Sequence, residues 1–276
     1  MTTTTLSHLV HLHSDKTTPM DFLLYIGAGA TVGFIVGMTG IGGGALMTPL
    51  LLSFGFPAHT AVGTDLLYAA LTKAGGAYSH HKQRHVNWNL VKLLAIGSLP
   101  AAFVTGALLH FFFNDAEDYG DLLKSALGIM LVLTAIVIFM RSRIQAFAAA
   151  RNARNWSRFR PIATILMGML LGVFVTLSSV GAGAIGTAIL MILYPALRGT
   201  HIVGTDIAHA VPLTLAAGLI HLGLGNVDFM LLGALLIGSI PAIHVGSLLS
   251  RRVPDSILRP ALASILLFIG ARYMIQ

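Results

Sequence analysis

Two aspartates stand out because each lies inside a long apolar stretch of the chain. Asp65 follows the residues Val-Gly-Thr at 62–64, and Asp206 follows the same three residues at 203–205. A carboxylate inside a membrane costs about 2.5–3.5 kcal/mol on insertion scales, so it normally faces a cavity or a partner. We interpret Asp65 and Asp206 as groups that bind and release a proton. The alternative is that each Thr-Asp pair caps the start of a helix.

Two further titratable side chains follow these aspartates closely in the sequence. Lys73 lies eight residues after Asp65, which places it within about 80° of Asp65 around a helix of 3.6 residues per turn. It could supply positive charge to an anion, pair with an aspartate, or extend toward the membrane surface. His209 lies three residues after Asp206 on the same helix face, so we expect it to relay protons. A hydrogen bond between helices is the alternative role for His209.

The remaining histidines do not suggest a metal site. The chain has 12 histidines, but no close pair with metal-ligand spacing falls within one apolar run. It has no cysteine, so a thiolate ligand and a cysteine nucleophile are both excluded. We therefore expect no bound metal, no cofactor and no enzymatic centre.

Glycine clusters occupy matching places in the two halves of the chain. Gly42, Gly43 and Gly44 form the first cluster, and Gly181 and Gly183 belong to the second. Each cluster stands between an apolar run and a shorter apolar run. A helix break there would leave backbone N–H groups and the positive end of a half-helix facing a cavity, which favours an anion. Close packing of helices through small residues is the alternative.

Three hydroxyl side chains lie beside these predicted breaks. Thr39 precedes the first cluster, and Ser178 and Ser179 precede the second. We predict that they hydrogen-bond the oxygens of a substrate. Hydrogen bonds to their own helix backbone are an equally good interpretation.

The elements that carry these residues are duplicated. Residues 62–108 align with residues 203–249 at a constant offset of 141 positions, and Gly-Ser-Leu-Pro-Ala at 97–101 recurs as Gly-Ser-Ile-Pro-Ala at 238–242. Duplication of an apolar unit that glycines interrupt is how many membrane transporters are built.

The composition places the chain in a lipid bilayer. Of its 276 residues, 55% are hydrophobic and only 10% are charged, and its mean hydropathy is +0.82. A soluble globule needs more polar residues than this to cover its surface. The basic residues stand in short loops between apolar runs, so the isoelectric point near 10.1 reflects membrane topology rather than nucleic-acid binding.

Ten apolar segments are expected, five in each half. The second segment of each half is shorter than the roughly 20 residues that a spanning helix needs, so we expect it to form a half-helix. We predict an N-terminal tail at 1–21, a first transmembrane repeat at 22–141, a basic cytoplasmic linker at 142–159 and a second repeat at 160–276. The segments run at 22–40, 43–56, 60–80, 88–113, 122–141, 160–179, 182–197, 201–223, 227–249 and 255–275.

Charge counting predicts the orientation of the segments. Residues 141–160 hold six arginines and should be cytoplasmic, whereas residues 114–121 carry four acidic residues and should lie outside. Because five is odd, equivalent segments then enter the membrane from opposite sides. The predicted fold is an all-α polytopic membrane protein with two inverted-topology repeats and with both termini periplasmic.

A set of glycine, proline and aromatic motifs recurs along the chain. It consists of Gly40-Ile41-Gly42-Gly43-Gly44, Pro49, Val62-Gly63-Thr64 and Val86-Asn87-Trp88, with Val227-Asp228-Phe229 in the second half. This pattern resembles the sulfite exporter TauE/SafE family, also called TSUP, and the resemblance covers essentially the whole chain from residue 22 to residue 275. It implies a carrier in the bacterial inner membrane for small sulfur-containing anions such as sulfite, sulfoacetate or other organosulfonates.

These observations favour a secondary transporter over other membrane proteins. We expect an exporter that works by alternating access, with proton coupling if the aspartates titrate. A passive anion channel shares every sequence feature of such a carrier, and a membrane-bound haem or metal enzyme is disfavoured because the histidines are scattered. The expected partners are a small anion, the lipid bilayer and protons, without nucleic acid, and a homodimer is an assembly that the sequence leaves open.

Overall fold

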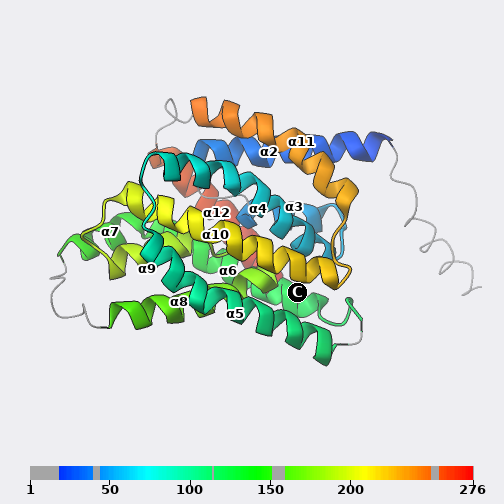
Figure 1. Ribbon diagram of the computed structural model, residues 1–276. Helices are drawn as coiled ribbons and strands as arrows, with labels where there is room; N and C mark the ends of the chain where they lie inside the picture. The colour runs from blue at the N-terminus through cyan, green and yellow to red at the C-terminus, as the bar shows by residue number, and fades with distance from the viewer. Residues whose placement is uncertain (1–18, 40–43, 114, 151–158, 250–254, 276) are drawn as a thin grey trace, which may run out of the picture.

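Apolar runs form helices throughout the computed structural model, which describes residues 19–39, 44–113, 115–150, 159–249 and 255–275 (Figure 1). Eleven helices and no strand occur in these ranges, so the predicted all-α class is confirmed. The helices are α2 (Pro19–Thr39), α3 (Gly44–Ser53), α4 (Ala58–Lys82), α5 (Trp88–Phe112), α6 (Gly120–Phe139), α7 (Arg141–Ala150), α8 (Arg160–Ser178), α9 (Ala184–Leu193), α10 (Gly199–Gly223), α11 (Phe229–Leu249) and α12 (Asp255–Ile275).

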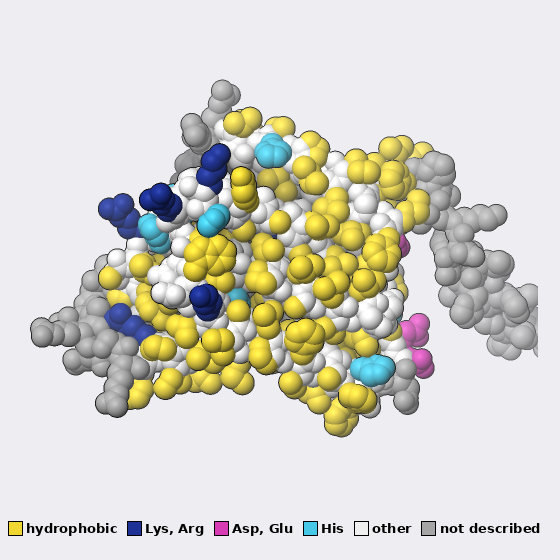
Figure 2. Space-filling view, viewed as in Figure 1, with side chains coloured by type: hydrophobic (Ala, Val, Ile, Leu, Met, Phe, Trp, Pro, Cys, Tyr) yellow, Lys and Arg dark blue, Asp and Glu magenta, His cyan; other side chains and the backbone are white. Residues whose placement is uncertain are grey.

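Seven of these helices are long and apolar enough to cross a membrane: α2, α5, α6, α8, α10, α11 and α12. Helix α4 is also 25 residues long, but Asp65, Lys73 and a basic last turn lower its hydropathy. Figure 2 shows hydrophobic side chains over much of one face of the molecule. Such a surface fits the hydrocarbon of a bilayer and not water.

Helices α3 and α9 are short, with 10 residues each. At 1.5 Å per residue each spans about 15 Å, which is half of a hydrocarbon core of about 30 Å. The break before α9 is explicit in the backbone, because Ser179 at the end of α8 is left-handed with φ 59° and Gly181 and Gly183 have φ 127° and 131°. The first predicted break, which includes Gly42 and Gly43, lies outside the described residues, and Gly44 begins α3.

The long helices pack in pairs through glycine. The pairs are α2 with α11, α5 with α8, α4 with α10, and α6 with α12. On α2, Gly33 lies so close to Ser239 of α11 that an added Cβ would overlap its backbone, and on α8 Gly172 stands in the same relation to Ser98 of α5. Ser98 and Ser239 occupy equivalent positions of the duplicated sequence, and Gly33 and Gly172 correspond at an offset of 139, so both halves use the same close contact.

The two ends of the molecule differ in charge. Helix α7 lies at one end of the molecule, and the start of α2 and the end of α12 lie at the other (Figure 1). In Figure 2, Lys and Arg side chains gather at the end that carries α7, and Asp and Glu side chains gather at the opposite end. Helix α7 itself falls within the stretch that we predict as a linker, and residues 151–158 of that stretch lie outside the described residues.

Candidate functional site

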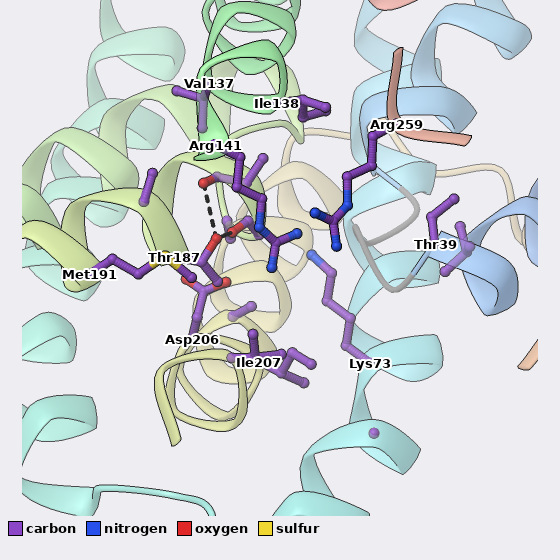
Figure 3. Close-up of a pocket in the computed structure, with 18 of the residues that line it drawn as sticks. Thr39, Lys73, Val137, Ile138, Arg141, Thr187, Met191, Asp206, Ile207 and Arg259 are labelled. Carbon is purple, nitrogen blue, oxygen red and sulfur yellow. Dashed lines mark hydrogen bonds between the residues drawn. The ribbon is translucent and has the colours of Figure 1, made fainter. Parts of the chain in front are cut away.

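A cavity of about 340 Å³ opens between helices of both halves of the chain (Figure 3). Its walls come from α2, α4, α6, α7, α9, α10, α11 and α12. Most of the lining is apolar, from side chains such as Val137, Ile138 and Met191. An apolar wall lowers the local dielectric, so the few charged groups that face this cavity act strongly on a ligand.

Three cations face this cavity. Lys73 reaches it from α4, Arg141 from the start of α7, and Arg259 from α12. In Figure 3 the nitrogen ends of these three side chains point toward one another. Three positive charges in one apolar cavity attract an anion, and a guanidinium can bind a planar or tetrahedral oxyanion through two parallel hydrogen bonds.

Asp206 supplies the opposite charge on the facing wall. It is 1% exposed, and neither carboxyl oxygen makes a hydrogen bond of good geometry to the described residues. The carboxyl faces the backbone N–H of Gly183 at the start of α9, and a Cβ added to Gly186 would overlap it. The group at the positive end of this half-helix is therefore the carboxyl of Asp206, where we expected a substrate anion alone.

Asp65 lies in a different environment, although its sequence position is equivalent. It is fully buried, accepts a hydrogen bond of 2.5 Å from the hydroxyl of Thr48 on α3, and lies beside Ser179. Asp65 is not among the residues that line the cavity of 340 Å³. Each aspartate is the eighth residue of a 25-residue helix, two turns past its start, so the alternative that they cap helix starts is wrong.

Some of the other predicted site residues line the cavity, and the rest make hydrogen bonds within or between helices. Thr39 and Gly183 line the cavity. Ser178 instead donates a hydrogen bond of 2.6 Å to the carbonyl of Phe174, which is the backbone alternative. His209 is fully buried, with Nε2 at 2.8 Å from the hydroxyl of Ser98.

Ser179 and Gly181 do not line the cavity of 340 Å³ and instead line a much smaller one of about 10 Å³. Among the described residues, no group of three or more His, Asp or Glu side chains is arranged to hold a metal ion. Thus Lys73, Asp206, Gly183 and Thr39 are the predicted site residues that the fold brings together.

Sequence reasoning missed Arg141 and Arg259 as site residues. Arg141 was counted with the basic linker, and Arg259 falls near the start of the last apolar segment. A basic residue at the edge of an apolar run normally marks the membrane surface. Only the folded structure, in which α7 packs against α9 and α12 packs against α6, reveals that both arginines face the cavity.

The sulfite exporter TauE/SafE family matches residues 25–273. The chain belongs to this family. No solved structure matches it.

Relatives of this TauE/SafE protein are named as membrane transporters. The chain is 42% identical over 249 residues to the probable membrane transporter protein YjnA of Bacillus subtilis, covering 88% of this chain and 96% of the relative. It is 30% identical to the probable membrane transporter protein YdhB of the same organism, over 86% of this chain and 96% of YdhB. It is also 30% identical to the probable membrane transporter protein MJ0441 of Methanocaldococcus jannaschii, over 91% of this chain and 96% of the relative. The TauE/SafE protein is thus a multi-pass membrane protein.

A buried polar network joins three helices of the TauE/SafE protein near its acidic end. The amide of Asn226 donates to the hydroxyl of Tyr119 at 2.6 Å and to Nδ1 of His221 at 3.0 Å. Nε2 of His221 in turn donates to the carbonyl of Thr176 at 2.9 Å. These contacts tie the start of α6 to the ends of α8 and α10. Buried polar networks of this kind hold one arrangement of helices and specify it.

Proposed function

We propose that this TauE/SafE protein is a secondary transporter that carries a small anion through the cavity between its halves by alternating access. The observation that carries the proposal is the convergence of Lys73, Arg141 and Arg259 on one cavity. Three cations and one carboxylate, Asp206, face this apolar cavity, so its lining carries an excess of positive charge that is suited to a bound anion. The family and its transporter relatives support the same class of function.

The two halves act in this proposal as inverted-topology repeats. The glycine contacts support it, since Gly29 meets Leu235 as Gly168 meets Leu94, at equivalent positions of the duplication. Two repeats related by an axis in the membrane plane can rock around a fixed site near the midplane and open it to either side. Helices of both halves line the cavity, as such a site requires.

The substrate in this proposal is a small sulfur-containing oxyanion such as sulfite, sulfoacetate or another organosulfonate. The family name supports this class, and sulfonate oxygens match the hydrogen-bond geometry of Arg141 and Arg259. An inside-negative potential pushes each negative charge outward by about 2.3 kcal/mol per 100 mV. Export of such an anion therefore has a driving force even without a coupling ion.

The same proposal gives Asp206 the proton-coupling role. Its carboxyl shares the cavity with the three cations. When ionised, it offsets one positive charge and repels an anion, and when protonated it does neither. Proton binding at Asp206 should therefore strengthen anion binding. A proton carried together with the anion would let an inward proton gradient drive import, whereas export driven by the membrane potential moves the anion alone.

Uptake of labelled sulfite and sulfoacetate into proteoliposomes tests the proposal. We expect saturable uptake by the wild type and its loss in Lys73→Met and Arg259→Met. Arg272→Met is the matched control, because Arg272 lies on α12 with Arg259 but is exposed and outside the cavity. Uptake of neither anion would contradict the proposed substrate class, and flux that never saturates would identify a channel.

A further inference from the structure

We propose that Asp65 belongs to a second binding site, which takes a dehydrated monovalent cation of the size of Na⁺. The site lies between α4, α6 and the break that separates α8 from α9. It deepens the proposed transport function, on which its coupling role rests, but its existence does not depend on the identity of the transported anion.

The carboxyl of Asp65 provides the charge for this site. Asp65 is 0% exposed, and one carboxyl oxygen, Oδ2, accepts the hydrogen bond from Thr48. The other oxygen, Oδ1, is buried and has no hydrogen-bond partner among the described residues. A buried carboxylate oxygen without a donor requires a proton or a cation to compensate its charge.

Two hydroxyls near the helix break also lack good hydrogen bonds. Oγ1 of Thr134 is buried and makes no hydrogen bond to the described residues, and Oγ of Ser179 approaches Asp65 without a hydrogen bond of good geometry. Thr134 is exceptional among the buried helical threonines, since Thr176 and Thr214 each donate to the carbonyl four residues earlier. Ser179 and Thr134 line one small cavity of about 10 Å³, and Ser179 also lies beside Asp65.

The helix break completes the wall of this small cavity. Val180, Gly181 and Ala182 line it, and all three lie between the end of α8 and the start of α9. The left-handed backbone at Ser179 and the positive φ of Gly181 take this segment out of helical geometry. Backbone segments of this kind in broken transporter helices supply carbonyl oxygens to coupling cations.

The oxygens and the size of the cavity select the ion. Carboxylate and hydroxyl oxygens are hard ligands that suit alkali and alkaline-earth cations. A single carboxylate neutralises a monovalent cation, whereas a divalent cation would leave a net positive charge buried in a low dielectric. A cavity that holds roughly one water admits one alkali cation without its hydration water. The charge of a carboxylate gives the site a strong field, which favours the smaller Na⁺ and Li⁺ over K⁺.

Thermal unfolding of the purified protein tests this site without any anion substrate. We expect NaCl or LiCl to raise the unfolding midpoint saturably relative to KCl and choline chloride at equal ionic strength, because a ligand that binds only the folded state stabilises it. Asp65→Asn, Thr134→Val and Ser179→Ala should each lose most of the Na⁺-dependent rise. Thr105→Val should keep it, since the Thr105 hydroxyl donates to the carbonyl of Ala101 in its own helix.

Each outcome of this experiment decides the proposal. Equal midpoints in all four salts would mean that the small cavity holds water only, and a Na⁺ effect that survives in both Thr134→Val and Ser179→Ala would reflect general salt stabilisation. Either result overturns the site. If Asp65→Asn does not fold, the two hydroxyl variants carry the test. Failure of anion uptake alone would reject the proposed substrate and leave a measured Na⁺ site intact.

Discussion

The carboxyl of Asp206 shares one cavity with the cationic ends of Lys73, Arg141 and Arg259. At the scale of single residues, an anion in this cavity would therefore lie near three positive charges and one negative charge. Asp65 has the equivalent place in the sequence but lies outside the cavity, hydrogen-bonded to Thr48. Asp65 and Asp206 can therefore bind different ions, although their positions in the duplicated sequence are equivalent.

Replacement of Asp206 by Asn should change how anion uptake depends on pH. Sulfoacetate is the substrate of choice, because its sulfonate and carboxylate both stay ionised from about pH 6 to about pH 8. In the wild type, uptake should rise as pH falls, because protonation of Asp206 removes a negative charge that repels the anion. Asp206→Asn is neutral at every pH, so its uptake should vary little.

The control for this experiment is Asp121→Asn, since the Asp121 side chain is 94% exposed and pairs with Lys124 at the surface. The control should keep the pH dependence of the wild type. An equal pH dependence in wild type and Asp206→Asn would remove Asp206 from the coupling mechanism.

At the scale of the elements, half-helices and glycine contacts determine where the site lies. Helices α3 and α9 are each long enough to span about half of the hydrocarbon thickness of a bilayer. Thr48 of α3 contacts Asp65, and Gly186 of α9 lies against Asp206. The long helices pack closely around these half-helices because glycine, which has no side chain, lies at their contacts.

Substitution of these glycines should destabilise the fold according to the space around each. In Gly33→Ala the new methyl group would overlap the backbone of Ser239, so we expect a loss of about 1–3 kcal/mol, typical of overpacking. Gly27→Ala on the same helix meets nothing within 4 Å and should be neutral or mildly stabilising. Thermal unfolding in detergent measures both, and equal midpoints would contradict the close packing of α2 on α11.

Much of the element order was predictable from the sequence. Apolar runs predicted segments at 88–113 and 201–223, where α5 and α10 lie, and the glycines at 181 and 183 marked the break before α9. The cationic lining was only partly predictable. Lys73 stands out because it interrupts an apolar run, but Arg141 and Arg259 resemble ordinary basic flanks until the chain is folded.

At the scale of the whole molecule, the charge difference between the two ends bears on orientation in the membrane. The end that carries α7 is basic, and the end that carries the described termini is acidic (Figures 1 and 2). Basic loops favour the cytoplasm. We therefore propose that both termini and the acidic loop before α6 face the periplasm.

Single-cysteine labelling tests this orientation cleanly, because the natural chain has no cysteine. In intact cells, an impermeant thiol reagent should label Asp118→Cys in the acidic loop. It should label Lys82→Cys, at the last residue of α4, only after the membrane is opened. The reverse pattern would invert the predicted topology while leaving the fold unchanged.

The central claim is that the three cations form an anion site, and calorimetric binding of sulfite to the purified protein tests it most directly. Loss of one charged hydrogen-bond donor costs about 1.5–3 kcal/mol, so Arg259→Met should weaken binding by roughly 10-fold to 100-fold. Arg259→Lys should retain part of the affinity, and Arg272→Met should retain all of it. Binding by Arg259→Met that equals the wild type would contradict the account.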